Sequence, residues 1–239
     1  MNRKRKKTFI AVIVTVLLLV LVFVLYRYNY IPHKKYTNEQ FNMKYSVSHK
    51  SNGKDETGDQ TGIEIFKSSK DADGDGIDDQ TDILENAKNY IAAKPKYKSK
   101  YYDTGYPNDG YGVCTDVVAF ALWDAGYDLQ KLVDEDIALH REDYELDEPD
   151  VNIDFRRVKN LAVFFQNTAI PLTLDTKQIA EWQGGDIVIF KNHIGIVSDN
   201  RNAKGVPFII HHASIIQADY EEDILETWGE IVGHYRISE

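Results

Sequence analysis

An uncharged run of nineteen residues, from Thr8 to Tyr26, stands near the start of this 239-residue chain. A helix of that length, at about 1.5 Å per residue, comes close to the hydrocarbon thickness of a bilayer, about 30 Å. Five basic residues precede the run and only Arg27 follows it closely, a bias that keeps the N-terminus in the cytoplasm. A cleaved signal peptide is the alternative, but the run ends without the small residues of a cleavage site. The sequence therefore predicts a cytoplasmic tail at residues 1–7 and a membrane-spanning anchor at 8–26, with the rest of the chain outside a bacterial cell membrane.

The part of the chain beyond the anchor is acidic. Residues 1–35 carry 8 basic and no acidic side chains, which leaves 20 basic against 38 acidic side chains in the remainder, a net charge of −18. So acidic a body should repel nucleic-acid phosphates, and we expect no nucleic acid as partner. Residues 27–70 are polar with weak hydrophobic periodicity, so an extracellular linker is expected there.

Carboxylates recur in the segment 71–82 at the spacing of a calcium-binding loop. Positions 1, 3, 5, 9 and 12 of the loop are acidic, and position 7 would offer its carbonyl oxygen; this gives the ligand set Asp71, Asp73, Asp75, Ile77, Asp79 and Asp82. Position 12 usually holds the longer Glu, so Asp82 is expected to reach the ion through one oxygen. The alternative is an acidic turn in which Asp82 caps a helix that begins near Ile83. Five acids at these offsets favour structural calcium.

The chain has one cysteine, Cys114, at the start of an apolar stretch closed by Gly126. Unpaired backbone N–H groups at a helix start favour thiolate over thiol and can stabilise an oxyanion. A buried structural thiol is the alternative. A single cysteine in an exported chain cannot pair internally and is exposed to oxidation, which is easier to understand if the thiol does chemistry.

Histidines follow on two predicted strands, His193 on one, and His211 with His212 at the end of the next. A hairpin turn centred on Asn202 would place His211 directly opposite His193, with Cβ atoms about 4.5 to 5.5 Å apart. His212 would then point to the other face by alternation, unless a β-bulge exchanges the two.

Several motifs together resemble a known family. These are Gly-Val-Cys114-Thr-Asp, the segment from Asn152 to Leu161, His193-Ile-Gly-Ile-Val-Ser-Asp199 and Gly233-His-Tyr-Arg236. They are similar to the YijF-like proteins, a bacterial family of unknown function, from about Asp82 to the C-terminus. That family resembles the NlpC class of cell-wall cysteine peptidases. The resemblance implies an α+β, papain-like catalytic domain at residues 83–239, with N-terminal helices packed on an antiparallel sheet.

The resemblance also implies roles for individual residues. Cys114 would be the nucleophile and His193 the base. The hairpin register favours His211 as the orienting residue, whereas a His212-Ala-Ser match to some NlpC-class enzymes favours His212. Tyr102 and Asp186 match a tyrosine and a Gly-Asp strand of the class, and are expected to bind substrate together with Arg157. Arg156 and Arg157 could hold a substrate carboxylate, but the composition around them favours neutralisation of their acidic neighbourhood. The class usually has Asp-Cys-Ser, whereas this chain has Val-Cys-Thr.

The function expected is hydrolysis of an amide bond in peptidoglycan stem peptides, with no cofactor for catalysis. Two alternatives remain open. The same Cys and His residues are zinc ligands by type. The domain could also be a catalytically silent cell-wall binding module.

Overall fold

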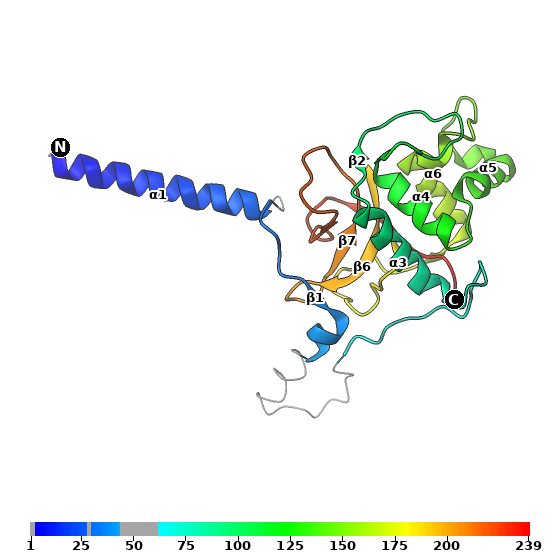
Figure 1. Ribbon diagram of the computed structural model, residues 1–239, viewed down its shortest axis with the longest axis horizontal. Helices are drawn as coiled ribbons and strands as arrows, with labels where there is room; N and C mark the ends of the chain where they lie inside the picture. The colour runs from blue at the N-terminus through cyan, green and yellow to red at the C-terminus, as the bar shows by residue number, and fades with distance from the viewer. Residues whose placement is uncertain (1–2, 28–29, 44–61) are drawn as a thin grey trace. The chain divides into compact units, whose positions relative to one another are not determined.

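The computed structural model describes residues 3–27, 30–43 and 62–239, and it divides into two units, Met1–His33 and Lys34–Glu239. The first unit consists mainly of one helix, α1 (Arg3–Arg27) (Figure 1). Its stretch Arg5–Tyr26 is long and apolar enough to cross a membrane. The chain thus has the N-terminal apolar helix that the uncharged run predicts.

The second unit is built on an antiparallel sheet. In spatial order its strands are β4 (Ile170–Pro171), β9 (Ile231–Arg236), β5 (Ile187–Phe190), β6 (His193–Arg201), β7 (Pro207–Ile210) and β8 (Glu221–Glu222). A further strand near the start of the unit, β1 (Tyr36–Thr37), pairs with the far end of β6. Alternate residues of each central strand face two separate cores, as in β5, where Ile187 and Ile189 face one core and Val188 and Phe190 the other.

The larger core lies between the sheet and the helices that precede it in the chain (Figure 1). These helices are α3 (Asp79–Ala92), α4 (Cys114–Asp124), α5 (Leu129–Leu139) and α6 (Val158–Thr168), with the 3-10 turns η1 (Arg141–Asp143) and η2 (Asp154–Arg156) between them. A small parallel pair, β2 (Lys96–Tyr97) and β3 (Tyr111–Gly112), leads into α4. The unit is a mixed α/β domain with helices ahead of an antiparallel sheet, as the sequence predicts.

The domain begins earlier than expected, so the predicted linker at 27–70 is wrong at both ends. Residues 38–43 are helical, Phe41 is buried, and the side chain of Asn38 accepts a hydrogen bond from the buried Arg201. At the other end of the segment Ile63 is buried, and Ser68 bonds to Ser238 at 2.7 Å. The middle of the predicted linker, 44–61, lies outside the described residues.

The β6–β7 hairpin also differs from the predicted register. Ile196 pairs with Ile210, and Arg201 pairs with Pro207 after a register shift. The turn is therefore centred two residues later than Asn202, and the predicted direct pairing of His193 with His211 is wrong. Gly195 faces His211 instead, since a Cβ added to Gly195 would lie 3.3 Å from the His211 Cβ. A displacement of two residues preserves the face, so both histidines still point to the same side of the sheet.

Candidate active site

Cys114 is the first residue of α4 and is partly buried. Burial raises the pKa of its thiol to about 11, and the nearby charge of Asp116 adds to this rise, while backbone N–H groups, above all that of Ile194, oppose it. The helix start was expected to favour the thiolate. Burial outweighs that effect, so the resting thiol is protonated at neutral pH.

Asp116 lies within one turn of the thiol, and its charge is compensated. Its carboxylate accepts hydrogen bonds from the Val113 backbone N–H at 2.8 Å and from the Arg156 guanidinium at 2.6 and 3.0 Å. Arg156 also donates to the carbonyl oxygen of Lys100 at 2.7 Å. Arg156 thus joins η2 to the start of α4, which favours the interpretation that it neutralises an acidic neighbour.

The two histidines that share a face are joined in a hydrogen-bonded chain. His193 Nε2 lies 2.8 Å from His211 Nδ1, and His211 Nε2 lies 2.8 Å from the Glu222 carboxylate. Because a carboxylate accepts, His211 Nε2 carries the proton and its Nδ1 is the acceptor, so His193 Nε2–H is the donor. The lone pair of His193 is then on Nδ1, an atom with no hydrogen bond to the described residues.

His193 and His211 are both buried and neutral. Burial lowers the pKa of His193 to about 2 and that of His211 to about 3. The indole of Trp228 covers them, with its ring centroid 4.5 Å from that of His193 and 5.2 Å from that of His211. In the resting protein the two imidazoles and the Cys114 thiol are therefore all uncharged.

The Cys114 thiol lies close to β6, where it contacts the backbone N–H of Ile194, the residue after His193. Across the described part of the chain no hydrogen bond joins the Cys114 thiol to His193 itself. Cys114 packs against the core on the helix side of the sheet, whereas His193 pairs with Phe190, whose side chain faces the other core. The structure therefore places nucleophile and base near the same end of β6 but on opposite faces of the strand. Sequence reasoning missed Glu222, which lies on the two-residue strand β8 and carries no periodic signal.

His212 points to the opposite face of the sheet, as alternation predicts. Its side chain is buried among the rings of Tyr97 and Tyr220, with centroid distances of 5.4 and 4.9 Å. Neither ring nitrogen has a hydrogen-bond partner among the described residues. His211, and not His212, is therefore the histidine that contacts His193.

Tyr102 and Arg157, two residues predicted to bind substrate, lie at the surface. The Tyr102 hydroxyl donates to Asp109 at 2.8 Å, and Arg157 pairs with Asp154 at 3.2 Å. The segment ahead of α4 also carries a lysine at every second position, to which the sequence interpretation assigned no role: Lys94, Lys96, Lys98 and Lys100.

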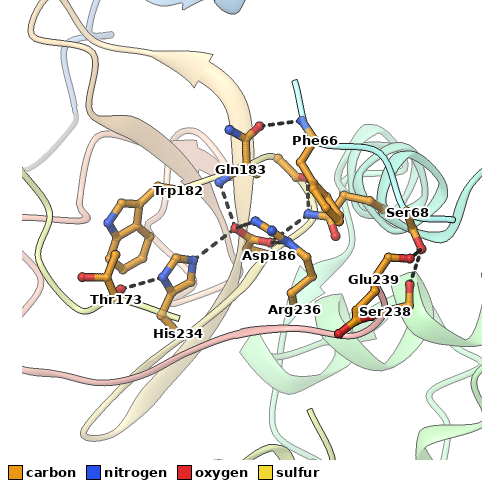
Figure 2. Close-up of polar contacts among 12 residues, drawn as sticks. Phe66, Ser68, Thr173, Trp182, Gln183, Asp186, His234, Arg236, Ser238 and Glu239 are labelled. Atoms are coloured by element: carbon orange, nitrogen blue, oxygen red, sulfur yellow. Dashed lines mark hydrogen bonds and ion pairs between the residues drawn. The ribbon is translucent and has the colours of Figure 1, made fainter. Parts of the chain in front are cut away.

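Asp186, the third predicted substrate residue, is fully buried at the centre of a structural network, so that prediction is wrong (Figure 2). Its carboxylate accepts hydrogen bonds from Arg236 at 2.8 and 3.0 Å, from His234 at 3.1 Å and from the Gln183 backbone N–H at 2.8 Å. Gln80 of α3 donates a further bond at 2.9 Å. All the donors come from the protein itself, so the Gly-Asp motif fixes α3 and β9 to the start of β5.

The acidic loop brings three of its predicted ligands together. Carboxylate oxygens of Asp71, Asp73 and Asp75 lie within 4.8 Å of one another. Backbone N–H groups of Gly74 and Gly76 donate to Asp71 at 2.7 and 2.9 Å and fold the loop around it. Three converging carboxylates suit a hard cation that prefers oxygen ligands.

The later positions of the loop are engaged differently. Asp79 accepts from the Ala72 backbone N–H and from the Tyr127 hydroxyl, so both its oxygens are occupied by protein groups. Burial, and then the charges of Asp73 and the other loop acids, raise the pKa of Asp82 to about 6. The predicted helix start near Ile83 with Asp82 as cap is wrong, because α3 begins at Asp79 and its N-cap is Asp78.

Comparison with known proteins places the domain in a family. The family described as "Domain of unknown function (DUF1287)" matches residues 84–237, more than half of the chain, and the chain belongs to it. A relative from Escherichia coli (strain K12), "Uncharacterized protein YijF", is 38% identical over 167 residues, which cover 64% of this chain and 80% of the relative. The resemblance to a YijF-like family is thereby confirmed. No solved structure matches the chain.

Proposed function

We propose that the protein is a membrane-anchored cysteine hydrolase with a papain-like fold that cleaves an amide bond outside the bacterial cell membrane. The observation that carries this proposal is the hydrogen-bonded chain from Glu222 through His211 to His193. It holds a neutral base with an unshared lone pair at the start of β6, the strand whose second residue, Ile194, lies at the Cys114 thiol. Catalysis requires the His193 imidazole to reach round this end of β6 to the face on which Cys114 lies. The orienting residue of the triad is His211, and Glu222 acts behind it as a positioning residue.

The reaction proceeds by general base catalysis, because the resting thiol and imidazole are both neutral. His193 Nδ1 takes the Sγ proton as the sulfur attacks the amide carbonyl, and a tetrahedral oxyanion forms. The Cys114 backbone N–H at the start of α4 stabilises this oxyanion. The imidazolium returns its proton to the leaving amine, and a thioester remains on Cys114. Water, deprotonated by His193, then hydrolyses the thioester and regenerates the thiol.

Peptidoglycan stem peptides are the substrate class we propose, on the resemblance to the NlpC class and on the position of the anchor. The positive charge ahead of α1 supports a cytoplasmic N-terminus and an extracellular domain. Hydrogen bonds occupy both nitrogens of His211, which favours the triad over a zinc site. The acidic loop supports a structural calcium ion, held by Asp71, Asp73 and Asp75, in addition to the triad.

The test uses the detergent-solubilised full chain and purified cell-wall fragments, with products followed by mass spectrometry. Hydrolysis gives two products whose masses sum to that of the fragment plus one water. We expect Cys114→Ala and His193→Ala to abolish cleavage and His211→Ala to reduce it severely. His140→Ala, which removes an exposed histidine, is the matched control. Uncut fragments would favour the binding module, and stoichiometric zinc lost in the Cys114→Ala protein would favour the metal site.

A further inference from the structure

A cluster of polar groups without partners lies next to the Cys114 site. Among the described residues only three buried side-chain nitrogen or oxygen atoms lack a hydrogen-bond partner: the Tyr90 hydroxyl and the two ring nitrogens of His212. The two rings are neighbours, with centroids 6.5 Å apart. Buried polar groups are nearly always paired, since leaving one unpaired costs free energy. Three such atoms in one place therefore indicate a group that the protein itself does not supply.

Tyr90 connects this cluster to the nucleophile. Its side chain reaches from α3 to Gly112, two residues before Cys114, and a Cβ added to Gly112 would lie 2.1 Å from the hydroxyl oxygen. Only glycine leaves room for the hydroxyl at this position. The charge of Cys114 would also contribute to the pKa of Tyr90, which places the hydroxyl near the sulfur.

The chemistry of the cluster suits an amide better than an anion. Burial lowers the pKa of His212 to about 4, so the ring is neutral and offers one N–H and one lone pair. Tyr90 offers a hydroxyl whose pKa is raised by burial, so that it stays a donor. The nearby Asp116 carboxylate disfavours an anionic ligand. A peptide amide presents both a carbonyl acceptor and an N–H donor, which match these groups.

We propose that Tyr90 and His212 form a substrate subsite that binds a peptide amide next to the scissile bond. The Tyr90 hydroxyl donates to the carbonyl of that amide, whose N–H donates to the unprotonated nitrogen of His212. The inference rests on the proposed function, because the subsite serves Cys114. The rings of Tyr97 and Tyr220 cover the subsite, and Tyr97 belongs to the two-residue strand β2, so substrate entry displaces a short segment and leaves the main sheet in place.

Two reagents that differ in one backbone group test the subsite. Both are acetylated dialanine chloromethyl ketones, and in one of them an ester oxygen replaces the central amide N–H. Intact mass of the solubilised full chain follows alkylation of Cys114. We expect wild type to react roughly tenfold faster with the amide reagent, about the value of one hydrogen bond to a buried group. The ratio should fall close to one in His212→Leu, because only the amide reagent has the N–H that His212 accepts. Tyr90→Phe should slow both reagents roughly tenfold, because both keep the carbonyl that the hydroxyl binds. The control Tyr235→Phe should keep both the ratio and the rates.

Iodoacetamide, which is too small to reach the subsite, measures the thiol alone. Its rate should be the same in wild type, Tyr90→Phe and His212→Leu, and both variants should melt no lower than wild type, because each removes unpaired polar atoms. An unchanged ratio of the two ketones in His212→Leu, together with unchanged ketone rates in Tyr90→Phe, would overturn the inference and indicate a structural water site. Failure of the proposed function would look different: cell-wall fragments would stay uncut, and Cys114 would react with the ketones no faster than free cysteine, which overturns the inference as well.

Discussion

Arg156 holds the carboxylate of Asp116 through two hydrogen bonds, 2.6 Å from Nε and 3.0 Å from Nη2, with both side chains buried. Asp116 also caps the start of α4 through the Val113 N–H. The pair therefore fixes the helix end that carries Cys114. Removal of Arg156 would leave a buried carboxylate without its counter-charge.

Replacement of Arg156 by Met should therefore be strongly destabilising. We expect the free energy of unfolding in urea to fall by about 3 to 5 kcal/mol, as for other broken buried ion pairs. Arg157→Met is the matched control, since the exposed Arg157–Asp154 pair should contribute under about 1 kcal/mol. Equal losses in the two variants would contradict the structural role of Arg156.

Local periodicity predicted much of this domain correctly. The uncharged run gave the helix α1, and alternation gave the two faces of β6 and β7. His193 and His211 share a face even though the register was wrong, because an error of two residues does not change the side to which a side chain points. Features that depend on period alone are thus readable from one sequence.

Long-range pairing was not readable in the same way. Asp116 and Arg156 are forty residues apart, and Glu222 comes from a two-residue strand whose place at the sheet edge no local pattern specifies. Asp186 follows a glycine turn and resembles a surface residue in sequence. Its burial results from donors of α3 and β9, which only the fold brings together.

The buried histidines should make the protein sensitive to acid. The pKa of His212 lies near 4 in the folded state against about 6.5 when unfolded, so the neutral ring contributes stability above pH 6.5 that is lost as pH falls towards 4. In His212→Leu the slope of unfolding free energy against pH should be smaller by up to about 1.4 kcal/mol per pH unit in this range. Urea unfolding at pH 7, 5.5 and 4.5 measures it. His140→Leu, an exposed histidine, is the control, and an unchanged slope in His212→Leu would contradict the buried neutral ring.

The acidic loop should bind calcium with the modest affinity of extracellular modules, about 10⁻⁴ to 10⁻³ M. Calcium at ten times its Kd stabilises the folded state by about 1.4 kcal/mol, a rise of roughly 2 to 4 °C in Tm over chelator. Asp73→Ala should abolish the rise. Glu85→Ala, which removes an exposed carboxylate from the outside of α3, should keep it. If the Tm of wild type is the same with calcium and with chelator, the loop is an acidic turn that binds no calcium.

The segment just after α1 should be part of the folded domain and not a tether. Lys35 pairs with Asp219 at 3.0 Å and with Glu221 at 2.8 Å, next to the Glu222 of the histidine chain. Phe41 packs against Gly205, where a Cβ would lie 2.6 Å from the ring. These contacts attach the segment 34–43 to β6 and β8.

A soluble chain that begins at residue 34 should therefore be more stable than one that begins at residue 44. We expect a difference of roughly 3 kcal/mol, because the shorter chain exposes the apolar surface that Phe41 covers and leaves the Arg201 Nε without Asn38. Urea unfolding of the two chains measures the difference. Within the longer chain, Lys35→Met should lower stability, whereas Lys34→Met, which removes a lysine over the Tyr36 ring, should change it by less than about 1 kcal/mol. Equal stability of the two chains would contradict this prediction. The segment 34–43 would then be a linker, because its contacts with the sheet would contribute nothing measurable to the free energy of unfolding.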